Sequence, residues 1–307
     1  TDPDAREWAQ WRPALEEALP GETWVTVADR AQCDAREIEI AIVANPPAAS
    51  LQGLPRLRLI QSLWAGVDKL LADATVPLDV PLARMVDPAM NEAMAETALW
   101  AVLSLQRDFF TYAAQQREAR WQAHAQRRAD ETCVAVLGLG EMGRTVAQRL
   151  VRCGHGVLGW SRSLASLRGV QCHSGQGGLH EVLGAAHIVV NLLPLTPQTR
   201  GLFNRETFLR MRRGASLVNL ARGTHVLEDD LLEALEAGQI RHAVLDVFAQ
   251  EPLREDHPYW RHPRVTVLPH VAAQTDPRTA AEIAAANVRA LRAGEPLSHQ
   301  VNRARGY

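Results

Sequence analysis

The chain alternates short apolar runs with longer segments in which apolar residues recur every three or four positions. One run ends at Gly138, and others follow at residues 157–160, 188–193, 217–220, 243–247 and 265–268. Continuous apolar strands separated by amphipathic helices are typical of a parallel sheet that is covered on both faces. We therefore predict a doubly wound, Rossmann-type α/β domain with about six strands.

The first hundred residues repeat this alternation on a smaller scale. Strand candidates at 24–27, 38–44, 57–63 and 80–85 predict a smaller, flavodoxin-like α/β domain. Residues 91–121 are expected to form one or two long helices, and 98–105 are too apolar for a solvated linker, so this segment should pack between domains or subunits. An Ala-rich helix at 280–291 is expected to return to the first domain.

A glycine-rich turn joins the first strand of the larger domain to its helix. The sequence there is Gly138-Leu139-Gly140-Glu141-Met142-Gly143. In a dinucleotide-binding turn, one glycine permits the tight turn, one lets the pyrophosphate approach, and one lets the helix pack on its strand. The start of the helix then offers N–H groups to phosphate. We therefore assign residues 96–280 to a dinucleotide-binding domain, and residues 1–95 with 281–307 to a discontinuous substrate domain.

Composition and charge favour small-molecule chemistry. The 307 residues are 47% hydrophobic with a formal net charge of -2, so electrostatics favours neither nucleic acid nor an anionic membrane as partner. No apolar run reaches the roughly 18 residues of a membrane span. The opening TDPDAREWAQWR lacks the regions of a signal peptide, which predicts a cytoplasmic protein.

The cysteines and lysines exclude two kinds of site. The four cysteines form no C-x-x-C pair, which argues against a zinc cluster or a redox dithiol, and we expect no metal. Lys69 is the only lysine, and it lies outside any G-x-x-x-x-G-K sequence. A P-loop phosphotransferase is therefore excluded.

Polar residues follow the predicted strands of the larger domain. Ligands of open parallel sheets bind beyond the carboxyl ends of the strands. In chain order these ends are followed by Gly138, Ser161 with Arg162, Pro194, Arg222, Glu251 and His270. One edge of the sheet is thus expected to collect glycines, arginines, a carboxylate and an imidazole.

These residues lie in a series of motifs that covers most of the chain. The motifs are LWAGVD at 63–68, NEAMAE at 91–96, GLGEMG at 138–143, LPLT at 193–196, NLARG at 219–223, DVF at 246–248 leading to Glu251-Pro252, and LPH at 268–270. Together and in this order, they resemble the D-isomer-specific 2-hydroxyacid dehydrogenases, and within them the bacterial A-type glyoxylate/hydroxypyruvate reductases.

The resemblance implies a role for each of three strand-end residues. Arg222 binds the carboxylate and carbonyl of a 2-oxo acid, His270 is the acid/base, and Glu251 orients and charges that histidine. The chemistry requires the same residue types, because hydride delivery to a ketone leaves negative charge on oxygen. A guanidinium stabilises that charge and a protonated imidazole neutralises it. Singly, each residue could be an ordinary surface or loop residue; their joint occurrence favours catalysis.

The resemblance also implies contacts with the substrate and the cofactor. It assigns the substrate carboxylate to backbone N–H groups of Ala65, Gly66 and Val67. Trp64 stands where the family has a small residue, and it either lines the pocket or stacks in the core. The cofactor contacts are assigned to Gly138, Gly140, Glu141, Met142, Gly143, Trp160, Ser161, Arg162, Ser163, Leu193, Pro194, Leu220, Ala221 and Asp246.

Two rival functions use the same fold. A nicotinamide-sensing, corepressor-like interaction protein would keep these residues, and a dehydrogenase of another small acid, such as formate or phosphite, would share the fold. Glu251 resembles the hydroxyacid enzymes, because formate enzymes carry glutamine there. The long helix from Asn91 onward, with the resemblance, predicts a homodimer.

The end of the second strand points to the cofactor. NAD-preferring sites normally carry an acid there, which accepts hydrogen bonds from the ribose 2′-hydroxyl. Here the sequence reads Trp160-Ser161-Arg162-Ser163, which offers donors and positive charge to a 2′-phosphate. The alternative role for Arg162 is that of a solvated loop residue. We predict NADPH as the preferred cofactor, with NAD possible.

Arg162→Ala tests this cofactor assignment. Because the lost charge would face the 2′-phosphate, the substitution should raise the Michaelis constant for NADPH much more than that for NADH. Steady-state kinetics with both cofactors measures the two changes. Equal effects on both constants would contradict the assignment.

Overall fold

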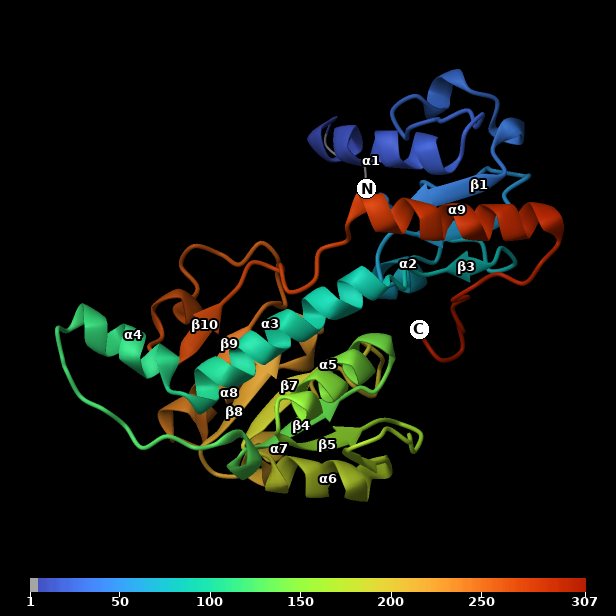
Figure 1. Ribbon diagram of the computed structural model, residues 1–307. Coiled ribbons are helices and arrows are strands. Elements are labelled where there is room, and N and C mark those ends of the chain that lie inside the picture. The colour runs from blue at the N-terminus through green and yellow to red at the C-terminus, as the bar shows by residue number, and fades with distance from the viewer. Residues whose placement is uncertain (1–4) are drawn as a thin grey trace. The chain divides into compact units, whose positions relative to one another are not determined.

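The computed structural model describes residues 5–307 and divides them into two compact units. The first unit comprises the chain up to Met90 together with Thr275–Tyr307, and the second comprises Asn91–Gln274. Figure 1 shows the elements of each unit.

The second unit is built on a seven-stranded sheet. Its strands are β4 (Cys133–Leu137), β5 (Gly156–Trp160), β6 (Val170–His173), β7 (Ile188–Asn191), β8 (Ala215–Asn219), β9 (Ile240–Leu245) and β10 (Val265–Val267). They pair in parallel in the order β10-β9-β8-β7-β4-β5-β6. The direction of winding reverses between β4 and β7, which is the topological switch point of a doubly wound fold. The predicted fold class is confirmed.

The sheet has one strand more than the hydrophobic pattern predicts. The extra strand is β6, at the edge of the sheet beside β5. None of its four residues is fully buried, so no continuous apolar run marks it in the sequence.

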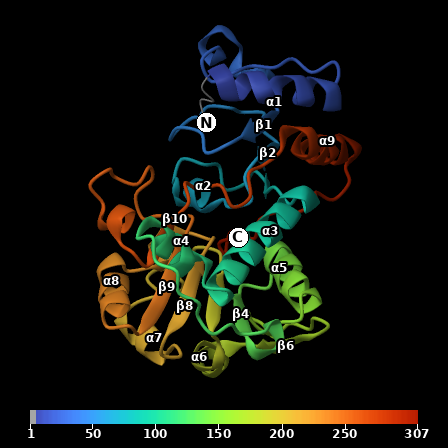
Figure 2. The ribbon, with the colours of Figure 1, turned by 60° about the vertical axis from the view of Figure 1, so that its left-hand side comes forward.

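Helices cover both faces of this sheet. They are α3 (Pro88–Gln106), α4 (Phe109–Arg117), α5 (Glu141–Arg152), α6 (Gly175–Ala185), α7 (Arg205–Arg210) and α8 (Glu228–Glu236). Alternate residues of β4 enter different cores: Val134 and Val136 pack with residues of α3 and α5, whereas Ala135 and Leu137 pack with α6 and α8. Figure 2 shows the ribbons of these helices around the sheet. Burying each large apolar side chain stabilises the domain by about 1.5–3 kcal/mol.

The apolar segment at 91–121 forms two helices, α3 and α4. On α3, the side chains of Ala98, Val102 and Leu105 are buried in the core of the second unit. Trp100 and Leu103 lie on the outer side, and 42% and 37% of their surfaces are exposed.

The first unit contains a three-stranded parallel sheet. Its strands are β1 (Ile40–Val43), β2 (Leu59–Ser62) and β3 (Leu82–Ala83), and its helices are α1 (Ala5–Ala18), α2 (Asp68–Ala72) and α9 (Pro277–Ala293). Ala285 and Val288 of α9 pack with Leu59 of β2, so the C-terminal helix completes the core of this unit.

The strand predicted at residues 24–27 is wrong. These residues belong to no strand, and Trp24 packs against Trp8 of α1 at 6.4 Å between ring centroids. Residues 24–27 instead form a loop that packs against α1. The prediction failed because a short apolar run does not distinguish a strand from another buried segment.

The remaining short elements are 3₁₀ helices. They are η1 (Arg30–Gln32), η2 (Ala35–Glu37), η3 (Ala129–Glu131), η4 (Gly223–His225) and η5 (Pro258–Arg261). Among the described residues, no helix is both long and apolar enough to cross a bilayer. Residues 5–307 also contain no cluster of three metal-ligating side chains.

Candidate active site

The three glycines of the turn after β4 have different surroundings. Gly138 has φ +96°, and a Cβ on it would lie 2.7 Å from the carbonyl oxygen of Leu192. A Cβ on Gly143 would lie 1.7 Å from the carbonyl oxygen of Gly138, so α5 approaches the turn as closely as only glycine permits. A Cβ on Gly140 would meet no atom within 4 Å. The turn is therefore tight at two glycines and open at the third.

The open glycine lies at the start of α5. Gly140 is the N-cap residue, and no side-chain hydrogen bond caps this end of the helix. The helix begins with Glu141 and Met142, and its first N–H groups carry the positive end of the helix dipole. This end of α5 is suited to a phosphate group.

The residues at the end of β5 form a short hydrogen-bonded loop. The N–H of Ser161 donates to the carbonyl oxygen of His173 at 3.2 Å, and its hydroxyl donates to the carbonyl oxygen of Ser163 at 2.8 Å. Trp160 donates its indole N–H to the carbonyl of Gly175 at 2.9 Å. Arg162 is exposed. Residues 160–163 include no aspartate or glutamate, so this loop presents no carboxylate.

The loops after β8 and β9 meet through a glycine. A Cβ on Gly223 would lie 1.8 Å from the carbonyl carbon of Phe248, so these two backbones touch. Arg222 precedes this glycine, and its Nη1 donates to the carbonyl oxygen of Ala221 at 2.7 Å. The contact between the loops brings Arg222 toward the segment that carries Glu251.

His270 and Glu251 form a hydrogen-bonded pair. The Nδ1 of His270 lies 2.8 Å from Oε2 of Glu251, and the N–H of Phe248 donates to Oε1 of the same carboxylate at 2.9 Å. About half of the His270 side chain is exposed. Because Nδ1 is occupied by Glu251, Nε2 is the nitrogen through which His270 can exchange a proton with a ligand.

Asp246 supports the backbone around His270. Its two carboxylate oxygens accept the N–H groups of Val271 at 2.7 Å and Ala272 at 3.1 Å, and its carbonyl accepts that of His270 at 2.9 Å. Burial raises the pKa of Asp246, and the two backbone hydrogen bonds oppose that rise. These bonds hold His270 in a left-handed conformation with φ 55°.

The electrostatics of the pair favour a charged histidine. The hydrogen bond that Nδ1 of His270 donates to Glu251 raises the pKa of His270 above its ordinary value of 6.5, against the effects of burial and of Arg222. Burial by itself raises the pKa of Glu251, but the hydrogen bonds from His270 and the Phe248 N–H outweigh it, and this pKa lies below its usual value. His270 is therefore protonated more readily near neutral pH than a free histidine.

The residues predicted to bind the substrate carboxylate form a loop of the first unit, after β2. The Ser62 hydroxyl accepts the N–H of Trp64 at 3.0 Å and donates to its carbonyl at 3.1 Å. Trp64, Ala65 and Gly66 are half-buried, and Val67 is buried at the start of α2.

Other predicted residues lie at the strand ends of the second unit. Leu193 and Pro194 follow β7, and Leu220 and Ala221 follow β8. Leu193, Leu220 and Ala221 are buried.

Two polar residues at these strand ends escaped the sequence analysis. Asn191 ends β7 and His225 lies in η4, and neither side chain is exposed to solvent. The sequence does contain a signal for Asn191, which lies inside the apolar run IVVNLLP. An amide in such a run is costly to bury unless it is paired, so a buried polar partner could have been expected.

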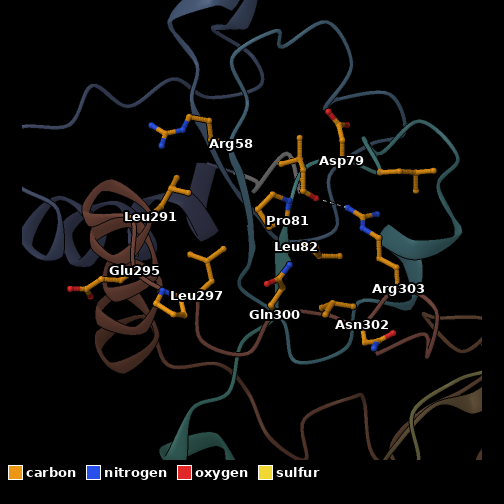
Figure 3. Close-up of a pocket in the computed structure, with 15 residues that line it drawn as sticks. Arg58, Asp79, Pro81, Leu82, Leu291, Glu295, Leu297, Gln300, Asn302 and Arg303 are labelled. Atoms are coloured by element: carbon orange, nitrogen blue, oxygen red, sulfur yellow. Dashed lines mark hydrogen bonds between the residues drawn. The ribbon is translucent and has the colours of Figure 1, made fainter.

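A separate cavity of about 760 Å³ lies in the first unit (Figure 3). Its lining mixes charges of both signs, including Arg58, Asp79, Glu295 and Arg303, with apolar residues such as Leu297. None of the predicted site residues lines it. Arg303 donates to the carbonyls of Pro77 and Val80, so its guanidinium stabilises the wall of this cavity.

Comparison with known proteins places the chain among redox enzymes. The family model described as "D-isomer specific 2-hydroxyacid dehydrogenase, NAD binding domain" matches residues 99–272. A glyoxylate/hydroxypyruvate reductase A from Serratia proteamaculans is 40% identical over 303 residues, covering 97% of this chain and 96% of the relative. A reductase of the same name from Klebsiella pneumoniae is 40% identical over 302 residues, with the same shares of both chains.

Solved structures that this chain resembles include 2-hydroxyacid dehydrogenases as well. A D-isomer specific 2-hydroxyacid dehydrogenase from Xanthobacter autotrophicus, in complex with NADPH and MES, superposes with a TM-score of 0.93 at 42% identity, covering 97% of this chain and 96% of that one. An NADPH-dependent glyoxylate/hydroxypyruvate reductase from Sinorhizobium meliloti, in complex with NADP and sulfate, gives a TM-score of 0.91 at 34% identity, with the same shares.

The pair of His270 and Glu251 predicts a specific pH dependence. If His270 gives up a proton during reduction of a 2-oxo acid, kcat/KM should fall as the pH rises through the pKa of His270, above 6.5. Glu251→Gln keeps a hydrogen-bond acceptor but removes the charge, so this fall should move to lower pH. The pH profile of kcat/KM for each protein measures the shift.

Two further variants complete this experiment. Glu255→Gln alters an exposed carboxylate of the same loop and should leave the profile unchanged. His270→Asn should lower turnover on the order of a hundredfold to ten-thousandfold. An unchanged midpoint in Glu251→Gln, or near-normal turnover in His270→Asn, would remove the pair from the mechanism.

Proposed function

Because the chain belongs to the D-isomer-specific 2-hydroxyacid dehydrogenase family, we propose that it reduces small 2-oxo acids, such as glyoxylate and hydroxypyruvate, with NADPH. The observation that carries this proposal is the hydrogen bond between His270 and Glu251, with Arg222 near enough to influence the pKa of both. A cation and an acid/base at one edge of a parallel sheet suit the reduction of a carbonyl group beside a carboxylate.

The second unit fits a nicotinamide dinucleotide. The open space at Gly140 and the uncapped start of α5 suit its pyrophosphate. Ser161, Arg162 and Ser163 would hold a 2′-phosphate, and the absence of a carboxylate in this loop favours NADPH. Contacts with the rest of the cofactor are assigned to Glu141, Met142, Gly143, Trp160, Leu193, Pro194, Leu220, Ala221 and Asp246. When bound, the nicotinamide supplies the hydride.

The chain itself supplies charge and a proton. The guanidinium of Arg222 binds the carboxylate and carbonyl of the 2-oxo acid and stabilises negative charge that develops on the carbonyl oxygen. His270 donates its Nε2 proton to that oxygen, and Glu251 holds the imidazolium by Nδ1. In the reverse direction His270 accepts the proton from the hydroxyl group.

The substrate carboxylate is assigned to the first unit. Backbone N–H groups of Ala65, Gly66 and Val67 bind it, and Gly66 allows a close approach to the backbone. Trp64 begins this loop and is held by Ser62. We propose that its indole lines the pocket and limits the size of the oxo acid, which favours substrates with short side chains.

The first experiment compares cofactors and oxo acids directly. We expect rapid NADPH oxidation, followed as loss of nicotinamide absorbance, with glyoxylate or hydroxypyruvate. Turnover should be slower with NADH, and slower with phenylpyruvate than with either small acid. NADPH binding without turnover of any oxo acid would favour the nicotinamide-sensing protein, and faster turnover of phenylpyruvate would contradict the role of Trp64.

The outer surface of the second unit predicts a homodimer. Trp100 and Phe109 are 42% and 52% exposed, and Trp121, in the segment after α4, is fully exposed. Large apolar side chains that are exposed on one subunit can be buried against another subunit. Sedimentation should give a mass of about twice 33.8 kDa, whereas a monomer would contradict the dimer.

A further inference from the structure

A buried polar network joins the ends of β7 and β8 to η4. The side-chain Nδ2 of Asn191 lies 2.9 Å from Oδ1 of Asn219 and 2.9 Å from Nδ1 of His225. The surface of all three residues is inaccessible to solvent. Buried polar groups are costly unless they are paired, so these bonds strongly restrict how the three segments can lie.

The network has a defined direction. Oδ1 of Asn191 accepts the backbone N–H of Leu193 at 3.3 Å, which identifies the other side-chain atom as the NH₂ donor. Nδ1 of His225 must then accept a hydrogen bond from Asn191, and the ring proton resides on Nε2. Nε2 faces the carbonyl oxygen of Pro194 at 3.4 Å and donates to it. His225 is therefore held as the neutral Nε2–H tautomer.

The two ends of the network lie at different parts of the proposed site. At one end, His225 contacts Pro194, in the turn assigned to the cofactor. At the other end, Asn219 donates through Nδ2 to the carbonyl oxygen of Arg222 at 3.0 Å, and its Oδ1 accepts the N–H of Ala221 at 3.3 Å. Arg222 is the residue assigned to the oxo acid.

The backbone of η4 reinforces this connection. The N–H of His225 donates to the carbonyl of Arg222 at 3.2 Å, and the N–H of Phe203 donates to the carbonyl of His225 at 2.8 Å. Gly223 is pressed against Phe248, so η4 has little freedom to move away from the strand ends. Hydrogen bonds therefore connect the carbonyl of Pro194 through His225 to the backbone of Arg222.

We propose that His225 is a positioning residue that couples the cofactor-binding turn to Arg222, so that NADPH and the oxo acid each strengthen binding of the other. The inference rests on the proposed function. His225 touches neither ligand in this scheme; it acts through Pro194 and through Asn191 and Asn219. Such coupling between two ligands is reciprocal, because each ligand stabilises the same arrangement of the strand ends.

His225→Leu tests the coupling, because leucine fills the site but forms no hydrogen bond. The dissociation constant of NADPH is measured with and without oxalate, a non-reducible acid similar in size to glyoxylate. In the wild type, oxalate should tighten NADPH binding by about fivefold or more, the lower limit for typical coupling between sites. In His225→Leu this factor should fall to near one, and the KM for NADPH and for the oxo acid should both rise.

His242→Leu is the matched control. His242 is another buried histidine of the second unit, and its Nε2 bonds to Oγ1 of Thr266 at 2.9 Å, but it lies within β9 and outside the network. This variant should lower the melting temperature at least as much as His225→Leu. It should leave the effect of oxalate and both KM values unchanged, which separates coupling from a general loss of stability.

His225→Asn provides a second test if the leucine variant does not fold. Its shorter side chain can still bond to Asn191 but cannot reach Pro194, so the coupling should again be lost. Wild-type coupling in either folded variant, or no coupling in the wild type, would overturn the inference. A wild type that binds no NADPH or reduces no oxo acid would instead overturn the proposed function.

Discussion

The parallel pairing of the seven strands is the constraint on which the rest of the second unit depends. Parallel strands all end at the same edge, so residues far apart in the chain meet there without any local sequence relation. Gly138, Arg222 and His270 each follow a different strand of this sheet. The winding reverses between β4 and β7, and open α/β sheets bind their ligands beyond the strand ends at such a reversal.

Close approach of backbones then brings these strand ends into contact. Gly143 lets α5 approach the turn at Gly138, and Gly223 lets the loop after β8 touch Phe248. A single Cβ at either position would overlap backbone atoms, so these glycines are required by packing as well as by the proposed chemistry. In the second case the same contact brings Arg222 toward Glu251. Burial raises the pKa of Glu251, the hydrogen bonds from His270 and Phe248 lower it, and the charge of Arg222 adds to that lowering.

Buried hydrogen bonds keep the proposed catalytic groups in place. Asp246 uses both carboxylate oxygens for the backbone after His270, while Asn191, Asn219 and His225 connect the ends of β7 and β8. His270 itself remains half-exposed, as a residue that exchanges protons with a ligand must be. Its charge is favoured by Glu251, whose own ionisation is supported by the Phe248 N–H. The reactive group is thus accessible, whereas Asp246 and the network of Asn191, Asn219 and His225 are buried.

The hydrophobic pattern by itself determined the Rossmann-type sheet, and the motifs determined the family; the fold and the comparisons confirm both. The roles of Arg222, Glu251 and His270 remain predictions. Tertiary structure alone decided that β6 is an edge strand and that residues 24–27 form a loop, because burial there comes from distant parts of the chain. It also decided the partners of His225, since Asn191 and Pro194 lie about thirty residues earlier and meet it only through strand pairing. Sequence periodicity reports local structure, whereas the partner of a buried polar group is set by the packing of the whole domain.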